Sequence, residues 1–220
     1  MDRQFYAMLS RMKYINRWAL MRNTREENIC EHSHEVAVLA HALALLHNRR
    51  FGGHADPGRC VLLALYHDAP EILTGDLPTP VKYDNPAIRE AYRQVEEVAA
   101  DRLLSLLPEE LRPDYAGLLK DDGTAAEERR LVKAADKLSA LIKCEEELRQ
   151  GNREFAQARL STERAVRAMG LPAADCFLDE VLPAYELTLD EQGRYRKQGG
   201  NGHDLRVCPW AGTAGRRMGC

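Results

Sequence analysis

The sequence lacks a long apolar run of the kind that crosses a membrane. Its longest apolar stretch covers residues 36–46 and contains His41, whereas a spanning helix needs about 20 apolar residues. Any signal-peptide core near the N-terminus is interrupted by basic side chains, at Arg3, Arg11, Lys13 and Arg17. We therefore expect a cytoplasmic protein without a membrane partner.

Cysteine is present without a recognisable pattern. Six cysteines lie at positions 30, 60, 144, 176, 208 and 220, with no C-x-x-C pair and no spacing of a disulfide framework. Four of them fall in segments predicted to be helical, where a buried free thiol is ordinary. This usage indicates a reducing compartment.

A large excess of charge of one sign is also absent, since the formal net charge is −3. Such a value gives no reason to expect attraction to a nucleic-acid polymer or a membrane. The small total hides an asymmetry, because residues 193–220 carry +5 and residues 1–192 therefore carry −8. The terminal segment also holds seven of the 15 glycines and few aliphatic residues, so it cannot offset its ordering entropy. We predict one domain over residues 1–192 and a disordered basic tail over 193–220.

Alternation of period two is absent throughout, and apolar residues recur at helical spacing instead. The sequence thus predicts an all-α fold, a helical bundle. The expected helices cover residues 2–13, 28–48, 57–73, 85–107, 108–120, 124–150, 153–169 and 173–191.

Local signals refine three of these helices. Asn28 precedes Glu31 by three residues and Thr124 precedes Glu127 by three, as in capping boxes. The helix from residue 28 is apolar nearly all round over residues 36–46, so it should be central and buried. For the helix over 85–107, the expected inner face is Ile88, Tyr92, Val95, Ala99, Leu103 and Leu106.

The stretch that organises the chain is residues 56–80. A helix with an Asp-Pro start and an apolar body leads into His67, Asp68 and, one turn later, Glu71. Spacings of three and four residues let these side chains share one side of the helix. Burying an imidazole and two carboxylates is costly unless something compensates them, and a divalent cation does so. Pro70 predicts a kink, and the Thr-Gly-Asp-Leu-Pro-Thr-Pro loop that follows suits the rim of a site.

Two more positions complete a candidate cation site. His32 lies in the first turn of the helix from residue 28, and Asp136 interrupts an apolar stripe mid-helix. With His67 and Asp68 they give two imidazoles and two carboxylates, a set that suits Mn, Co, Fe or Zn better than Ca. Such a site leaves coordination positions open for water and substrate, as hydrolysis requires.

Each residue also has a plainer interpretation. A His-Asp dipeptide occurs by chance, and His32 suits a helix surface. Asp136 has Lys133 and Lys137 as neighbours for an ion pair, and Glu71 suits a solvated helix face. Taken together and in this order, the positions favour a cation site.

These positions stand in motifs that resemble those of the HD-domain metal-dependent phosphohydrolases. The matching motifs are Glu31-His32-Ser33, His67-Asp68-Ala69-Pro70-Glu71 and Ala135-Asp136-Lys137-Leu138. One branch, the bacterial 5′-deoxynucleotidases, is similar over further segments: 16–18, 21–23, 27–28, 74–83 and 131–133. The resemblance covers about residues 5–190. It implies an all-helical HD domain that releases phosphate from deoxyribonucleoside 5′-monophosphates, usually as a homodimer.

The resemblance also implies roles for single residues. One divalent cation, Co²⁺ or Mn²⁺ first and Zn²⁺ or Fe²⁺ otherwise, is implied at His32, His67, Asp68 and Asp136. Substrate contacts are implied for Arg17, Trp18, His32, Asp68, Asp76, Leu77, Pro78, Thr79 and Asp136. The planar fork of Arg17 suits phosphate oxygens, and Asp76 can accept from a sugar hydroxyl. Trp18 has the alternative of packing against the first helix.

Glu71 and Asp68 are the expected catalytic residues. We hypothesise that a water attacks the phosphorus in line while Glu71 handles a proton, either from that water or to the leaving 5′-oxygen. Two alternatives stay open at this point. One is an HD phosphohydrolase for another phosphoester, such as a nucleoside triphosphate, cyclic nucleotide or alarmone. The other is a non-catalytic HD scaffold used for regulation.

Overall fold

The computed structural model describes residues 4–78 and 85–192. Within these ranges every element is helical, and the one other pairing is an antiparallel bridge between Asn16 and Asn28. The prediction of an all-α fold is confirmed. Of the predicted features, Thr79 and the tail over 193–220 lie outside the described residues.

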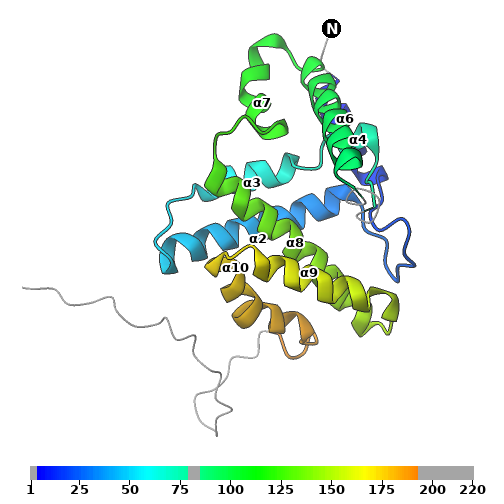
Figure 1. Ribbon diagram of the computed structural model, residues 1–220, viewed down its shortest axis with the longest axis vertical. Coiled ribbons are helices and arrows are strands. Elements are labelled where there is room, and N and C mark those ends of the chain that lie inside the picture. Colours follow the sequence, from blue (N-terminus) through cyan, green and yellow to red (C-terminus); the bar gives the residue numbers. More distant parts are fainter. Residues whose placement is uncertain (1–3, 79–84, 193–220) are drawn as a thin grey trace, which may run out of the picture.

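The chain runs from a short N-terminal helix to a series of short C-terminal helical turns (Figure 1). The elements are α1 (Phe5–Leu9), η1 (Ser10–Tyr14), α2 (Ile29–Arg50), α3 (Pro57–Tyr66), α4 (Glu71–Thr74), α6 (Pro86–Ser105), η2 (Glu109–Leu111), α7 (Arg112–Leu119), α8 (Ala126–Arg149), η3 (Arg153–Phe155), α9 (Ala156–Ala168), α10 (Pro172–Cys176), η4 (Phe177–Val181) and η5 (Leu182–Glu186). No helix in the two described ranges is long and apolar enough to cross a bilayer. The cysteines found there are free thiols: Cys60, Cys144 and Cys176 are buried, as expected, whereas Cys30 is exposed.

Helices α2, α3 and α8 form the centre of the molecule. Both α3 and α8 pack on α2, and α9 packs on α8 (Figure 1). Fully buried aliphatic side chains such as Leu43, Leu131 and Leu138 fill the space between them. Because such interiors are closely packed, the core fixes the relative positions of the helices that carry the candidate site.

Helix α2 begins as predicted but is not buried on all sides. The side chain of Asn28 accepts hydrogen bonds from the backbone N–H of Cys30 and of Glu31, at 3.0 Å each. Val38 is 57% exposed and Leu45 is 42% exposed. The helix is central, as expected, but it is only partly buried, because the packing partners of α2 cover only part of its circumference.

Helix α8 begins differently from the prediction. The residue before it, Ala125, is left-handed with φ 54°, and no side chain caps the helix. The Thr124 hydroxyl donates to Asp122 Oδ1 at 2.6 Å instead of bonding to the helix, so the predicted capping box is wrong. At the other end, Gly151 with φ 83° follows α8 as predicted.

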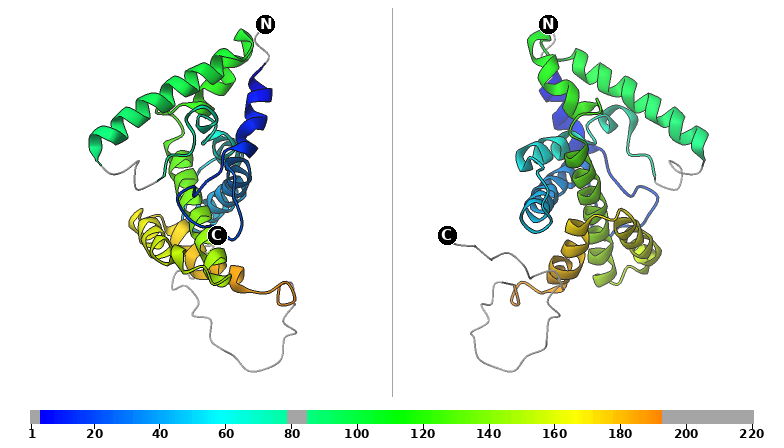
Figure 2. Two further views of the ribbon diagram at one scale, coloured as in Figure 1. Left: turned by 90° about the vertical axis from the view of Figure 1, so that its right-hand side faces the viewer. Right: turned by 60° about the vertical axis from the view of Figure 1, so that its left-hand side comes forward.

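Helix α6 packs only through its C-terminal half. Leu103 is fully buried in a second apolar cluster, together with Phe5 of α1. The N-terminal half extends away from the central helices (Figure 2), and it leaves Ile88 36% exposed and Val95 50% exposed. The predicted inner face is therefore correct near Leu103 and wrong at these two positions, where no central helix lies opposite.

The helix that carries the His-Asp pair breaks at Pro70, as the predicted kink indicated. Helix α3 ends at Tyr66, and α4 begins at Glu71. Because Pro70 has no N–H, the Tyr66 carbonyl lacks its usual donor, and it accepts from the N–H of Ala69 at 3.1 Å instead. The N–H of Glu71 likewise bonds to the carbonyl of Asp68 at 3.0 Å. Bonds over three residues wind the chain more tightly than an α-helix.

Residues 15–28, which we call the N-terminal loop, are tied to α8 by a buried ion pair. Lys143 Nζ and Glu147 Oε1 lie 2.5 Å apart, and the two side chains are 6% and 1% exposed. Glu147 accepts from the backbone N–H of Thr24 at 2.9 Å, and Lys143 donates to the carbonyl of Arg25 at 2.6 Å. This pair holds the loop that carries two of the predicted substrate residues.

Candidate active site

Three parts of the core bring the four predicted cation ligands together. His32 lies in the first turn of α2, Asp136 lies mid-way along α8, and His67 and Asp68 follow the end of α3. The Nε2 of His32 is 3.1 Å from Asp136 Oδ1 and 3.6 Å from Asp68 Oδ2. The Nε2 of His67 is 3.1 Å from the same Asp68 oxygen, and the two ring centroids are 5.3 Å apart. We call these four residues the His/Asp cluster.

Both imidazoles are held through the nitrogen that faces away from the carboxylates. The Nδ1–H of His67 donates to the carbonyl oxygen of Ala64 at 2.6 Å. The Nδ1 of His32 lies 3.0 Å from the hydroxyl of Ser139. With Nδ1 occupied, the Nε2 of each ring faces the cluster, which is a common way for a neutral imidazole to meet a metal.

The charges of the cluster favour an added cation. Burial opposes a positive charge on His67, but the carboxylates of Asp68 and Asp136 raise its pKa to about 9. Burial opposes ionisation of Asp68, yet His67 and His32 lower its pKa to about 2. For His32, burial and the nearby Arg17 lower the pKa. The raised pKa of His67 reflects the negative charge of the two carboxylates, which would also attract a cation.

The residues fit a divalent metal ion. Ligand atoms of His32, His67 and Asp68 all lie within 4.8 Å of one another, and Asp136 lies against His32. Within the described part of the chain, the buried Nε2 of His67 has no hydrogen-bond partner, and the nearest ionised group is the Asp68 carboxylate at 3.1 Å. Two imidazole nitrogens and two carboxylates form a donor set that first-row divalent metals accept.

The structure does not fit the plainer interpretations of His32, Glu71 and Asp136. His32 is fully buried rather than on a helix surface, and Glu71 is only 7% exposed. In the ranges that the structure describes, no ion pair joins Asp136 to Lys133 or Lys137. The carboxylate of Asp136 faces into the cluster instead.

A cavity of 560 Å³ opens beside the cluster. The predicted residues that line it are Arg17, Trp18, Asp68, Glu71, Asp76, Leu77, Pro78 and Asp136. His32 is fully buried and is not among them. The sequence analysis missed the opposite lining from α8 and α9, which consists of Lys137, Ala140, Gln157, Ala158, Ser161, Thr162 and Ala165. The one sequence feature that marks this lining is a face of α9 with small and polar side chains, and such a face does not by itself indicate a site.

Glu27 organises the two substrate residues of the N-terminal loop. Its carboxylate lies 3.4 Å from Arg17 Nη1 and accepts from Trp18 Nε1 at 2.8 Å. Burial opposes the charge on Arg17, but Glu27 and Asp136 raise its pKa. Trp18 has φ 59°, which is uncommon for a residue other than glycine. Its ring packs with its centroid 5.3 Å from that of Phe155.

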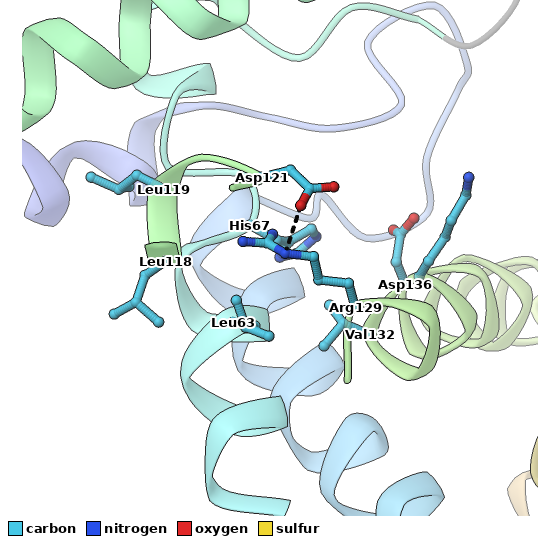
Figure 3. Close-up of a pocket in the computed structure, with 9 residues that line it drawn as sticks. Leu63, His67, Leu118, Leu119, Asp121, Arg129, Val132 and Asp136 are labelled. Carbon is cyan, nitrogen blue, oxygen red and sulfur yellow. Dashed lines mark ion pairs between the residues drawn. The ribbon is translucent and has the colours of Figure 1, made fainter. Parts of the chain in front are cut away.

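A smaller cavity of 260 Å³ reaches His67 and Asp136 from the side of α7. Figure 3 shows the ion pair between Arg129 and Asp121 in this cavity, with the Arg129 Nε 3.1 Å from the Asp121 carboxylate. Arg129 also donates to the carbonyl oxygen of Gly117 at 2.8 Å. Because this arginine is engaged by the protein, the larger cavity is the better candidate for substrate.

Comparison with known proteins identifies the family. A family model described as 5′-deoxynucleotidase YfbR-like matches residues 4–185. The 5′-deoxynucleotidase of Yersinia pestis (strain Pestoides F) is 50% identical over 187 residues, which cover 85% of this chain and 95% of that relative. The same figures hold for the 5′-deoxynucleotidase of Yersinia pseudotuberculosis serotype O:3 (strain YPIII).

Solved structures share the fold. An HD-domain phosphohydrolase from Listeria innocua has a TM-score of 0.73 at 26% identity, covering 83% of this chain and 88% of its own. The Cyanophage S-2L HD phosphohydrolase, bound to dA and one catalytic Zn²⁺ ion, has a TM-score of 0.58 at 20% identity, covering 80% and 95%; this likeness shows the fold alone. The predicted HD-domain bundle is confirmed. The chain therefore belongs to the YfbR-like 5′-deoxynucleotidase family and is an enzyme of the phosphoric monoester hydrolase class.

Proposed function

We propose that this chain hydrolyses deoxyribonucleoside 5′-monophosphates to a deoxyribonucleoside and phosphate. The observation that carries the proposal is that the two carboxylates of the His/Asp cluster line one cavity together with Arg17. Its 560 Å³ is within the range of about 300–1,000 Å³ that is usual for small-molecule sites. The relatives named 5′-deoxynucleotidases at 50% identity support the class of substrate.

The His/Asp cluster is the proposed site of one divalent cation. Co²⁺ or Mn²⁺ is the first choice, and Zn²⁺ or Fe²⁺ suits the same donors. The zinc ion of the Cyanophage neighbour supports zinc as a member of this set. When bound, such a cation polarises a phosphoryl oxygen and makes a coordinated water more acidic. His32, His67, Asp68 and Asp136 would supply the ligands.

Arg17 is the proposed phosphate ligand. Its guanidinium presents several N–H groups in one plane, which match phosphate oxygens in pairs. The contact with Glu27 uses one end of that group and fixes its direction. Trp18 would form part of the cavity wall next to Arg17, and Lys137 from α8 would add a second positive charge.

Glu71 is the proposed proton-transfer residue, with Asp68 beside it. Both carboxylates line the cavity, and Glu71 is almost fully buried. Glu71 would take a proton from the attacking water or give one to the leaving 5′-oxygen. Asp76, Leu77 and Pro78 are proposed to contact the deoxyribose, together with Thr79.

The test is a comparison of substrates with and without metal. Phosphate release would be measured from dAMP, dGMP, dCMP and TMP and from their ribose counterparts. The protein would first be treated with a chelator and then given Co²⁺, Mn²⁺ or Zn²⁺. We expect release that depends on the added cation and is faster for the deoxyribose series.

Other outcomes of the same test would overturn the proposal. Turnover of triphosphates or cyclic nucleotides, with none of the monophosphates, would favour the other phosphoester reaction. Cation binding without turnover of any nucleotide would favour the non-catalytic scaffold, which membership of an enzyme family already argues against.

We also propose the domain limits and the assembly. The family match ends at residue 185, and the most C-terminal buried apolar residue described is Leu178. These support a catalytic domain within residues 1–192, so truncation after residue 192 should leave turnover unchanged.

The family resemblance supports a homodimer, and the cysteine usage supports a cytoplasmic location. Light scattering of the purified protein checks the dimer, and a mass of one chain would contradict it.

A further inference from the structure

Behind His32, on the side away from the candidate cation site, lies a chain of two further polar side chains. The hydroxyl of Ser139 is 3.0 Å from His32 Nδ1 and 2.5 Å from Glu35 Oε2. His32 and Ser139 are both fully buried. Glu35 follows His32 by three residues on α2, and Ser139 follows Asp136 by three residues on α8. The chain of contacts thus joins the two helices one turn beyond the cluster.

When Glu35 is ionised, the contacts on the Nδ1 side of His32 favour one arrangement of their hydrogen atoms. A carboxylate can only accept, so the short contact uses the single hydrogen of the Ser139 hydroxyl. Ser139 must then accept from His32, which places a hydrogen on Nδ1. A neutral imidazole with a hydrogen on Nδ1 has its lone pair on Nε2.

That lone pair faces the cluster. The Nε2 of His32 is the atom that lies 3.1 Å from Asp136 and 3.6 Å from Asp68. Glu27 Oε1, at 3.7 Å from Nδ1, is too far for a hydrogen bond, but its charge also favours a hydrogen on Nδ1. The opposite tautomer would donate from Nε2 to Asp136 Oδ1, 3.1 Å away, and would point its hydrogen at the place that a cation has to occupy. The contacts on the Nδ1 side oppose that tautomer.

We infer that Glu35 and Ser139 are positioning residues that fix the Nδ1–H tautomer of His32 and so keep its Nε2 lone pair ready for a divalent cation. The inference rests on the proposed cation site and adds the residues that prepare it. Neither residue lines the substrate cavity. Groups that orient a metal-bound histidine in this way typically change metal affinity by about 10–100-fold when they are removed.

Four variants separate the effect of the Glu35–Ser139–His32 contacts from general effects of charge and folding. Ser139→Ala removes the acceptor for Nδ1, and Glu35→Ala frees the Ser139 hydrogen to turn toward His32. Glu35→Gln keeps a carbonyl oxygen that can accept from Ser139, so it should retain most of the function. Glu146→Ala is the matched control, because Glu146 is an exposed neighbour whose charge acts on Glu35 without touching Ser139.

Two measurements test the inference. Mn²⁺ binding to the metal-free full chain gives an affinity, and long-range proton–nitrogen spectra of ¹⁵N-histidine protein report which ring nitrogen of His32 carries the hydrogen. We expect Nδ1–H in the unaltered protein and a loss of Mn²⁺ affinity of about 10–100-fold in Ser139→Ala and Glu35→Ala. Glu35→Gln and Glu146→Ala should stay within about threefold.

The outcomes distinguish this inference from the proposed function. Mn²⁺ affinity within twofold of the unaltered protein in both alanine variants, or a hydrogen on Nε2 of His32, would overturn the inference. If the unaltered protein bound neither Mn²⁺ nor Co²⁺, the cation site would fail, while the spectra would still decide the tautomer. Should Ser139→Ala not fold, the comparison of Glu35→Ala with Glu35→Gln decides alone.

Discussion

Replacing Glu147 by alanine tests how the N-terminal loop is held, and the structure allows the effect to be estimated. The carboxylate of Glu147 accepts from Lys143 Nζ at 2.5 Å, from the Thr24 hydroxyl at 2.8 Å and from Asn152 Nδ2 at 2.9 Å. It also accepts from the Thr24 backbone N–H. The substitution would leave all these donors, including a buried ammonium group, without their acceptor.

Two estimates of the loss agree. Breaking a buried ion pair by removing one partner typically destabilises a protein by about 3–5 kcal/mol. Lys143 keeps its bond to the carbonyl of Arg25, which argues for the lower end. Burial opposes ionisation of Glu147, but its hydrogen bonds with Lys143 and Asn152 lower its pKa from 4.5 to about 2. That difference corresponds to roughly 3 kcal/mol of stability when the carboxyl is ionised.

The pH dependence has a definite sign. A carboxyl group whose pKa is lowered by folding stabilises the fold fully above its unfolded pKa. The contribution of Glu147 should therefore be present at pH 7 and be lost as the pH falls from about 4.5 toward 2. Urea unfolding followed by circular dichroism, at pH 7 and at pH 3, measures both the loss and its pH dependence.

A surface pair provides the control. Arg93 and Glu97 have the same spacing of four residues on α6, but their side chains are 56% and 49% exposed. Glu97→Ala should change the free energy of unfolding by less than about 0.5 kcal/mol. If Glu147→Ala changed it by less than about 1 kcal/mol, or by the same amount at pH 3 as at pH 7, the reasoning about the buried pair would be refuted.

Three further predictions concern the candidate active site. Asp136→Ala should abolish both the metal content of the purified protein and phosphate release, and retention of either would make Asp136 a structural residue. Glu71→Ala should lower kcat by about 10²–10⁴-fold at unchanged metal content; near-normal turnover would contradict its role. Arg17→Ala should lower kcat/KM by about 10–100-fold, because a charged hydrogen bond to the phosphate is lost. Steady-state kinetics checks this, and an unchanged kcat/KM would remove Arg17 from the site.

Sequence patterns predicted the helices and the cluster well because both depend on local information. The Asn28 cap, the break at Pro70 and the end of α8 at Gly151 each follow from the chemistry of one residue type. The His/Asp cluster was recognisable because charged groups interrupt otherwise apolar helices. His32 is fully buried, and its Nε2 lies 3.1 Å from the Asp136 carboxylate, whose side chain stays 37% exposed.

Features that depend on tertiary neighbours could not be predicted in the same way. Thr124 has the spacing of a capping residue, but Asp122 competes successfully for its hydroxyl. Val95 has helical spacing with Leu103, yet its side chain is 50% exposed, because α6 packs on its neighbours through only part of its length. The packing of Trp18 on Phe155 joins residues far apart in the chain, and no pattern near either one indicates it.

The break at Pro70 has a consequence for how two carboxylates are aligned. An α-helix rotates by about 100° per residue, whereas a 3₁₀ turn rotates by about 120°. Over the three residues from Asp68 to Glu71 the tighter winding completes a full revolution, while an α-helix would stop roughly 60° short. The missing N–H of Pro70 therefore sets the angle between the Asp68 and Glu71 side chains about the axis of the turn. Both side chains line the same cavity.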